Sequence, residues 1–510
     1  MHRFSWFSLL SIPLAHSLSI DLSPKVPKNA SAAIDPQFLG FGIEAGSFPD
    51  YTGNKSHPNG FSLNMFSTLS NRTGSPLPIR VGGTSMDHSI FDPSQKEAVN
   101  YPDNRTEGLR SNMTLGGPWI ESFSFLKEAK WILMVPLARY NLSNAVHFAN
   151  ASIGKMLDGT FEALEIGNEV NLYPGGVCKG TYSLSDYVHQ WTTYADVLSK
   201  NLSLHNGPDF WACSFASNTK WNVSTAFKDG LVNETGKVKA ISQHYYQTYG
   251  GMSLQDTLLN HTETSNKTST SFHRPVNYLR KNLTQPIPFI LGEVGSALGN
   301  GHKDYTLQAS LGSAIWTVDW MLYAMSIGVS RINMQMITQA PFSAWQPIPA
   351  TVGGQKQPAQ VLGGWYGHVF VADILGAGKG KKLQIAEWDL GKTDNGPGAV
   401  VAYSIYHDST LAQIVLLNEE LWHAEPGKER PGRNITLGPL GGVDKVQVQK
   451  LTGDNGTAQH NISWAGQRWS KEKNGHPETV ANDTIVLDVK NKAIDVEVKA
   501  TEALLISLMR

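Results

Sequence analysis

The stretch FEALEIGNE (161–169) is a short apolar run that ends in glutamate, and PFILGE (288–293) repeats this form later in the chain. Runs of this length and composition are typical of buried strands. In a parallel β/α barrel the carboxyl ends of all strands converge on one face, so we expect Glu169 and Glu293 to face each other across one cleft. Two facing carboxyls suffice to cleave a glycosidic bond, because one moves a proton while the other attacks the anomeric carbon.

A single glutamate after a strand is more often a solvated loop residue, so the surrounding residues decide the interpretation. Asn168 directly precedes Glu169, and Gly167 and Gly292 lie within two residues of the two acids, where they permit close approach of backbone or ligand. An Asn-Glu pair followed later by a second glutamate resembles the retaining glycosidases of clan A. In that clan the acid/base ends strand 4 and the nucleophile ends strand 7.

Eight short apolar runs recur along the chain, separated by intervals long enough for a helix. They span 38–46, 78–85, 131–137, 161–169, 210–215, 240–247, 288–295 and 331–337. Apolar residues at near-helical spacing fill several intervals, for example 183–200 and 306–327. This alternation predicts a (β/α)8 TIM barrel of fold class α/β, and we place it at residues 31–365.

After about residue 365 the pattern changes to short alternating strands with turn residues between them, as in 399–407, 411–418, 444–451 and 495–508. This pattern predicts an antiparallel β-sandwich over residues 366–510. The strand-like segment 18–30 precedes the barrel, and we expect it to join the β-sandwich as an edge.

Residues 1–17 combine a basic start, an apolar stretch and the small-x-small exit Ala15-His16-Ser17, which predicts a secretory signal peptide too short to span a membrane. Many Asn-x-Ser/Thr sequons follow it, which predicts a secreted, extracellular protein that carries N-linked glycans. The sequons include Asn29, Asn71, Asn104, Asn112, Asn141, Asn201, Asn222, Asn260, Asn282, Asn434 and Asn461.

The net charge of −1 and the pI near 7 provide no electrostatic field that would attract nucleic acid or an anionic membrane.

The only cysteines are Cys178 and Cys213. A disulfide between them and two buried free thiols are both compatible with the sequence. Two cysteines without histidines at ligand spacing cannot complete a zinc site, so we expect no metal and no cofactor.

Further polar residues fall at predicted strand ends, namely Glu44, Thr84, His244 and Gln335. A sugar needs several such hydrogen-bonding groups around its hydroxyls. The chain also carries RVGGT (80–84), EIGNE (165–169), HYY (244–246) and LGEVGS (291–296), with the two acids at strand ends. With these motifs it resembles glycoside hydrolase family 79. That family contains fungal and bacterial β-glucuronidases and animal heparanases, and the resemblance covers nearly the whole chain.

The resemblance implies a role for each matching residue. Glu169 would be the acid/base and Glu293 the nucleophile. Asn168 would bind the sugar 2-hydroxyl, and Tyr245 would be the phenol beside the nucleophile, where it favours the charged carboxylate. The remaining sugar hydroxyls would be held by Glu44, Thr84 and Gln335.

The chain departs from heparanase-like members after the nucleophile, where LGNG (298–301) replaces the Tyr-Gly-Gly turn that helps to hold the uronate carboxylate. We expect the amides of Gly299, Asn300 and Gly301 to bind this carboxylate instead. The predicted function is a retaining exo-β-glucuronidase that releases terminal glucuronic acid, with or without a 4-O-methyl group, from glycans or glycosides. The alternatives are an endo-acting heparanase-like hydrolase, a clan A exo-glycosidase for a neutral sugar, and a lectin-like protein on a catalytically inactive barrel.

Overall fold

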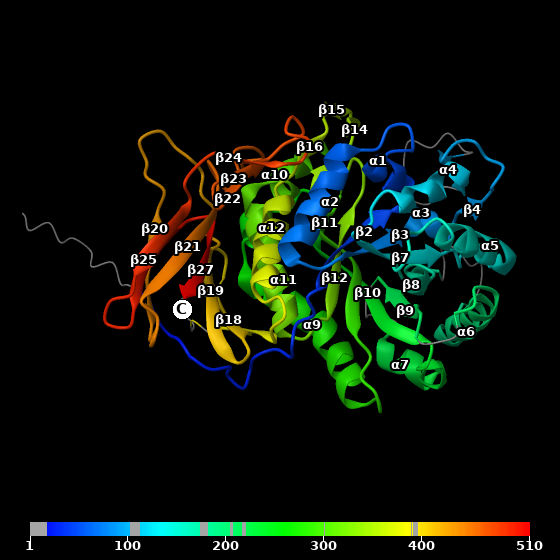
Figure 1. Cartoon of the computed structure of the whole chain (residues 1–510), viewed down its shortest axis with the longest axis horizontal. Coiled ribbons are helices and arrows are strands. Elements are labelled where there is room, and N and C mark those ends of the chain that lie inside the picture. Colours follow the sequence, from blue (N-terminus) through cyan, green and yellow to red (C-terminus); the bar gives the residue numbers. More distant parts are fainter. Residues whose placement is uncertain are drawn as a thin grey trace, which may run out of the picture.

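The computed structural model describes residues 18–101, 113–173, 182–204, 208–216, 221–299, 301–388, 390 and 396–510. Eight parallel strands close into a barrel, as the apolar runs predict, and the predicted TIM-type fold is confirmed (Figure 1). In chain order they are β2 (Leu39–Glu44), β3 (Leu77–Gly82), β7 (Ala129–Val135), β8 (Phe161–Ile166), β9 (Phe210–Phe215), β10 (Val238–Tyr249), β11 (Phe289–Leu298) and β12 (Arg331–Met336).

Helices cover the outside of the barrel. The longer ones are α2 (Gly60–Thr73), α5 (Leu142–Ile153), α6 (Leu184–Asn201), α7 (Val223–Lys228), α9 (His261–Lys281), α11 (Leu311–Ser326) and α12 (Gly364–Ala377). Local chemistry sets their starts: before α6, the Ser183 hydroxyl accepts the Asp186 amide at 3.1 Å while the Asp186 carboxylate accepts the Ser183 amide at 2.8 Å. This reciprocal capping satisfies backbone groups that the first helical turn leaves unpaired.

Short elements fill the loops around the barrel. The short helices are η1 (Ala45–Ser47), α1 (Phe48–Thr52), α3 (Thr84–Asp87), α4 (Gly117–Ile120), η2 (Glu121–Ser124), η3 (Val170–Leu172), η4 (Leu231–Glu234), α8 (Leu254–Thr257), η5 (His302–Asp304) and α10 (Tyr305–Gln308). The short strands are β4 (Ile90–Phe91), β5 (Val99–Asn100), β6 (Thr114–Leu115), β13 (Trp345–Gln346), β14 (Ala350–Val352), β15 (Gln355–Gln357) and β16 (Gln360–Val361).

The C-terminal residues form a β domain of two sheets. The larger contains β17 (Leu383–Glu387), β18 (Val400–His407), β19 (Thr410–Asn418), β21 (Lys445–Thr452), β22 (Ser463–Trp464), β23 (Gln467–Trp469), β24 (Pro477–Thr479), β25 (Thr484–Asp488) and β27 (Glu502–Met509). The smaller contains β1 (Leu18–Asp21), β20 (Gly432–Gly438) and β26 (Ile494–Lys499). Strand β1 pairs with β20 in parallel, so the N-terminal strand lies in the β domain.

The boundary between the two domains lies later than residue 365. Helix α12 packs against α2 and α11 and is the last barrel helix, so the β domain begins only at β17. The sequence pattern places the boundary too early because this helix is apolar all round, and its buried residues give no amphipathic period.

Alternation along the β-domain strands divides their side chains between two cores. Val401, Tyr403 and Ile405 of β18 belong to the core shared with the barrel helices, whereas Ala402 and Tyr406 pack towards the smaller sheet. Helices α11 and α12 therefore lie between the barrel and the larger sheet (Figure 1).

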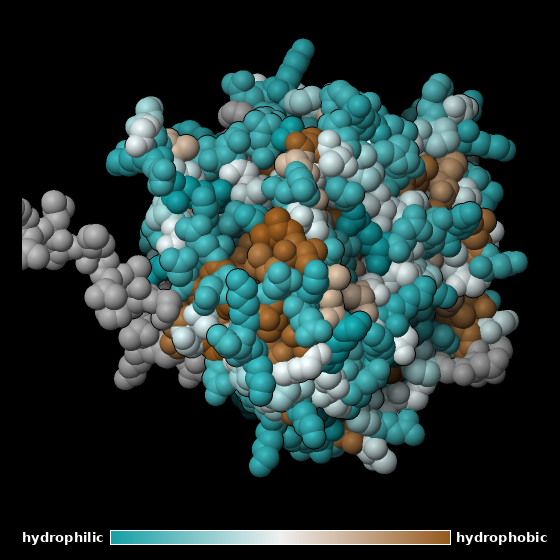
Figure 2. Space-filling view, turned by 60° about the vertical axis from the view of Figure 1, so that its left-hand side comes forward, coloured by the Kyte–Doolittle hydropathy of each residue, from teal (hydrophilic) through white to brown (hydrophobic). Residues whose placement is uncertain are grey.

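Hydrophobic side chains also gather on one face of the molecule, among hydrophilic ones (Figure 2). Among the described residues no helix combines the length and hydrophobicity that a membrane span requires.

A buried ionic cluster joins the barrel to the β domain. His261 at the start of α9 contacts Asp319 of α11 through Nδ1 at 2.9 Å and Glu387 of β17 through Nε2 at 2.8 Å. The His261 amide donates to Glu419 at 2.6 Å, and the Tyr403 hydroxyl donates to Asp319 at 2.7 Å. Burial opposes the charge on His261, but Asp319 and Glu387 outweigh it and raise the pKa of His261 well above its usual value. Burial and the charge of Asp319 raise the pKa of Glu419 well above its usual value.

We expect the free energy of unfolding to fall as the pH rises, because both raised pKa values mean that the folded protein holds protons that the unfolded chain releases. For Glu419 the loss begins above about pH 4.5, and for His261 above about pH 6.5, the ordinary pKa values of these side chains. Thermal unfolding followed by circular dichroism at about pH 5 and about pH 8 should show a smaller fall in midpoint for Glu419→Gln than for the parent. The exposed variant Glu425→Gln should keep the parental fall, and an unchanged fall in Glu419→Gln would contradict this account.

Candidate active site

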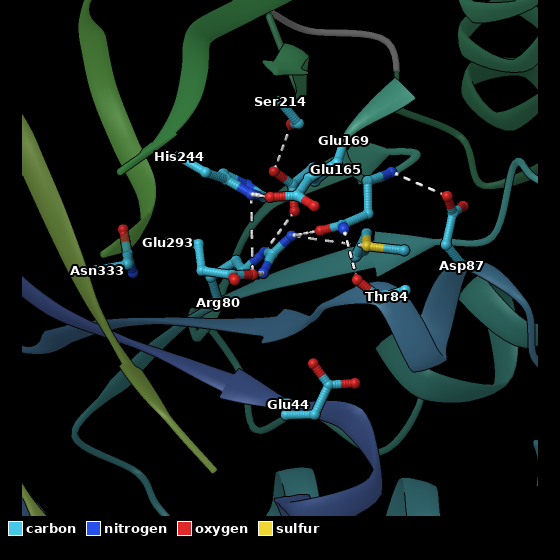
Figure 3. A network of polar contacts seen from close by, with 12 residues as sticks. Glu44, Arg80, Thr84, Asp87, Glu165, Glu169, Ser214, His244, Glu293 and Asn333 are labelled. Carbon is cyan, nitrogen blue, oxygen red and sulfur yellow. Dashed lines mark hydrogen bonds and ion pairs between the residues drawn. The ribbon is translucent and has the colours of Figure 1, made fainter. Parts of the chain in front are cut away.

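The two predicted carboxylates meet at the carboxyl end of the barrel (Figure 3). Glu169 follows β8 in a left-handed backbone conformation, with φ 47° and ψ 43°, and its amide donates to the Ser214 carbonyl at 2.8 Å. Glu293 lies within β11, in register with His244 of β10. One oxygen of each glutamate and a ring nitrogen of His244 all lie within 4.8 Å of one another. A strained backbone at such a position is typical of functional sites.

Both oxygens of Glu293 accept hydrogen bonds. Arg80 of β3 donates from Nη1 to Oε2 at 2.9 Å, and Tyr246 of β10 donates from its hydroxyl to Oε1 at 2.8 Å. Burial and the charge of Glu293 raise the pKa of Tyr246 well above its usual value, so the phenol stays protonated as a donor. Two donors on one carboxylate fix its orientation, as a nucleophile requires.

His244 lies between the two acids. Its Nδ1 is 3.1 Å from Glu169 Oε1 and 3.9 Å from Glu293 Oε2. These three side chains are the only His, Cys, Asp and Glu group among the described residues whose ligand atoms are close enough to hold a metal ion. Because Glu293 is already bound to the Arg80 guanidinium, which would repel a cation, the arrangement suits a pair of reacting carboxylates better than a metal centre.

Tyr245 does not lie beside Glu293, contrary to the prediction. Its ring stacks on Trp320 of α11 with centroids 5.7 Å apart, and its hydroxyl donates to Gln247. Successive side chains of a strand point to opposite faces, so Tyr245 faces the helices while His244 and Tyr246 share the inner face. The same period of two, counted from His244, could have identified Tyr246 from the sequence.

The residues predicted to bind sugar hydroxyls lie around the carboxylate pair. Asn168 receives a hydrogen bond from Arg80 Nη2 on its Oδ1 at 2.6 Å, and its Nδ2 lies 3.4 Å from the Thr84 hydroxyl. Gln335 is buried on β12, and neither of its side-chain polar atoms has a partner among the described residues. An unpaired buried amide is unfavourable, so Gln335 is suited to bind the hydroxyls of a ligand.

Glu44 ends β2 and is buried at the same face. Its Oε1 accepts the Ser85 amide at 3.1 Å and the Ser85 hydroxyl. Burial outweighs these hydrogen bonds and raises the pKa of Glu44 to about 7, so below neutral pH its carboxyl can donate to a sugar oxygen. Gly83 lies against this carboxyl with φ 98°, and a Cβ there would collide with Glu44.

Asp87 holds the ends of two barrel strands in place. Its carboxylate accepts the amides of Leu137 after β7 at 2.8 Å and of Asn168 after β8 at 3.3 Å, together with the Tyr173 hydroxyl. Burial outweighs these bonds and raises the pKa of Asp87 to about 6. Asp87 therefore supports the turn that carries Asn168 and Glu169.

Of the three loop amides predicted to bind the uronate carboxylate, that of Gly301 is already paired, which contradicts this part of the prediction. The Gly301 amide already donates to Asp304 Oδ2 at 3.1 Å, and Asp304 Oδ1 accepts the Gly251 amide at 2.8 Å. A Cβ at Gly299 would lie 3.0 Å from the same Asp304 carboxylate. The Asp304 carboxylate thus accepts from the Gly301 amide, and this carboxylate would repel a ligand carboxylate placed beside it. Asn300 lies outside the described residues.

Cys213 is a free, buried thiol on β9, and burial raises its pKa above the usual value. Cys178 lies outside the described residues. Of the two alternatives left open by the sequence, the described part of the chain favours the free thiol at Cys213.

Comparison with known proteins shows which family model and which enzymes the chain is similar to. Residues 402–505 match the family model of the glycosyl hydrolase family 79 C-terminal beta domain. The chain is 28% identical to a β-glucuronidase of Aspergillus niger, covering 98% of this chain and 97% of that protein. It is also 28% identical to a β-glucuronidase of Neurospora crassa, covering 91% and 90%.

Solved structures share the fold. A 4-O-α-L-rhamnosyl-β-D-glucuronidase from Fusarium oxysporum superimposes with a TM-score of 0.80 at 21% identity, covering 96% of this chain and all of that one. A family 51 α-L-arabinofuranosidase from Bifidobacterium longum superimposes with a TM-score of 0.60 at 14% identity, covering 96% and 99%.

Proposed function

We propose that this chain, a glycoside hydrolase that carries the family 79 C-terminal β domain, is a retaining exo-β-glucuronidase. The match to that domain confirms the resemblance seen in the motifs. The observation that carries the proposal is the pair Glu169 and Glu293 at one barrel face, with both oxygens of Glu293 held by donors. The reaction releases terminal β-linked glucuronic acid from glycans or glycosides, with or without a substituent on its 4-hydroxyl.

In the proposed first step, ionised Glu293 attacks the anomeric carbon while Glu169 gives its proton to the departing oxygen. In the second, Glu169 takes a proton from water, and the water oxygen displaces Glu293 from the same carbon. Retention requires direct attack, for which the carboxyls lie about 5–5.5 Å apart, whereas an interposed water requires about 6.5–9.5 Å. Oxygen atoms of the pair within 4.8 Å of each other support direct attack.

The remaining site residues take supporting roles in this proposal. Asn168, fixed by Arg80, binds the 2-hydroxyl next to the reacting carbon. Glu44, Thr84 and Gln335 bind the other hydroxyls. The carboxylate of the substrate needs donors other than the Gly301 amide, since that amide is already paired.

We also propose that the protein is secreted and carries N-linked glycans. The signal-like residues 1–17 and the many sequons support this. Sequon asparagines such as Asn29, Asn282 and Asn434 are exposed, so an attached glycan would extend into solvent.

A neutral-sugar exo-glycosidase of the same clan is the second candidate, because the Gly301 contact removes one expected partner of the uronate. Hydrolysis of aryl β-glycosides separates the two. We expect the glucuronide to be cleaved at least about 10³-fold faster, in kcat/KM, than the glucoside, galactoside or xyloside, since a site built for a charged group rejects analogues that lack it. Proton NMR of the first-formed sugar should show the β-anomer. Comparable cleavage of glucoside and glucuronide would favour the second candidate, and an α-anomer would exclude retention.

A further inference from the structure

A buried chain of contacts runs from Ser214 through Glu165 and Arg80 to Glu293, beside the carboxylate pair (Figure 3). The Ser214 hydroxyl donates to Glu165 Oε1 at 2.5 Å, and Arg80 Nε donates to Glu165 Oε2 at 2.6 Å. Arg80 then reaches Glu293 through Nη1 at 2.9 Å. The side chains of Arg80 and Glu165 have no exposed surface, and Ser214 is fully buried. None of Ser214, Glu165 and Arg80 stands among the acids and sugar-binding residues expected from the sequence.

Ser214 reaches this position through an irregularity at the end of β9. Cys213 and Ser214 are consecutive non-glycine residues with positive φ, at 77° and 45°, and the register with β10 shifts after Ser242. Such backbone is unfavourable and persists only where its surroundings hold it. The bend lets Ser214 make two contacts at once, because its carbonyl accepts the Glu169 amide at 2.8 Å while its hydroxyl donates to Glu165.

We propose that Ser214 and Glu165 are positioning residues that fix Glu169 relative to Glu293 and set the charge around Glu293. The proposal rests on the assignment of these two glutamates as the reacting pair. Ser214 connects the backbone of Glu169 to Glu293 through Glu165 and Arg80. Neither Ser214 nor Glu165 contacts Glu293 directly in this chain of contacts, so both act through Arg80.

Arg80 donates to two carboxylates, those of Glu165 and Glu293, so the charge of Glu165 competes with that of Glu293 for the guanidinium. Without that charge, Arg80 would donate to a single carboxylate, that of Glu293, and hold its negative charge more strongly, which makes the carboxylate a weaker nucleophile. The ionisable groups that face Glu293 are Arg80 of β3, His244 and Tyr246 of β10, Glu169 after β8 and Glu44 at the end of β2. Glu165 adds a further negative charge one contact away.

The test compares Glu165→Gln, Ser214→Ala and the control Ser242→Ala, on whichever aryl β-glycoside the parent cleaves best. Glutamine keeps the size of Glu165 but removes its charge, so kcat should fall about 10²-fold with KM changed less than about threefold. Both limbs of the pH–activity profile should move to lower pH, since loss of a negative charge favours ionised Glu293 and disfavours protonated Glu169. A purely structural role would lower activity without moving the limbs.

Ser214→Ala keeps the Glu165 charge and should lower kcat about tenfold, with little movement of the limbs. Ser242→Ala removes a buried hydroxyl from the adjacent strand that has no hydrogen-bond partner among the described residues, so it should keep parental kcat. Unmoved limbs in Glu165→Gln, or equal kcat in Ser214→Ala and Ser242→Ala, would overturn the proposal. If Glu165→Gln does not fold, as judged by circular dichroism, the comparison of kcat between Ser214→Ala and Ser242→Ala tests the proposal. Failure of the parent to prefer glucuronides would refute the proposed function alone, because these comparisons hold for any glycoside.

Discussion

Glu293→Gln is expected to abolish turnover, lowering kcat by at least about 10⁴-fold, because an amide cannot form the glycosyl ester that the first step requires. The fold should persist, since glutamine has the size of glutamate, its oxygen can still accept from Arg80, and its amide group can donate to the Tyr246 hydroxyl oxygen. Steady-state hydrolysis of an aryl β-glucuronide measures the loss. Glu128→Gln, which changes a half-buried carboxylate just before β7 at the opposite end of the barrel, should keep parental activity.

A second variant, Glu293→Gly, tests whether the carboxylate that is removed is the nucleophile. In Glu293→Gly, added azide should enter the space of the carboxylate, attack the anomeric carbon from the same side and give an α-linked glycosyl azide. NMR of the product distinguishes this anomer. Activity of Glu293→Gln within a few fold of the parent, or an azide product of β configuration, would exclude Glu293 as the nucleophile.

Glu169→Gln is expected to affect substrates according to their leaving groups. An alkyl or unactivated aryl glucuronide needs its oxygen protonated as the bond breaks, so kcat/KM should fall by about 10²–10⁴-fold, the usual contribution of general acid catalysis. A dinitrophenyl glucuronide departs without a proton, so its kcat/KM should fall less than about tenfold. Its kcat should still fall, because the second step loses the base that activates water.

Azide again provides a check, with the opposite stereochemistry. In Glu169→Gln it can attack the glycosyl ester on Glu293 without a base, so it should raise kcat for the dinitrophenyl substrate and yield a β-linked glycosyl azide. Equal losses of kcat/KM on activated and unactivated substrates would contradict an acid role for Glu169.

The sequence alone determined the barrel, the β domain and the two acids. Each barrel strand is a short apolar run, most long helices have a capping residue or a helical periodicity, and these signals are local. Because parallel strands bring their carboxyl ends together, the position of Glu169 and Glu293 at strand ends was enough to predict that they meet. The segment 18–30 could be assigned to the β domain for a similar reason, since a strand needs a partner.

Only the tertiary structure revealed what surrounds those acids. Arg80 and Glu165 are charged residues inside apolar strands, and nothing local shows that their partners lie on other strands. The bend at Cys213 and Ser214 has no glycine to mark it, and the amide of Gly301 is bound by Asp304 from the following turn. Strand ends follow from patterns of a few residues, whereas hydrogen bonds and ion pairs depend on which side chains the closed barrel brings within about 3 Å.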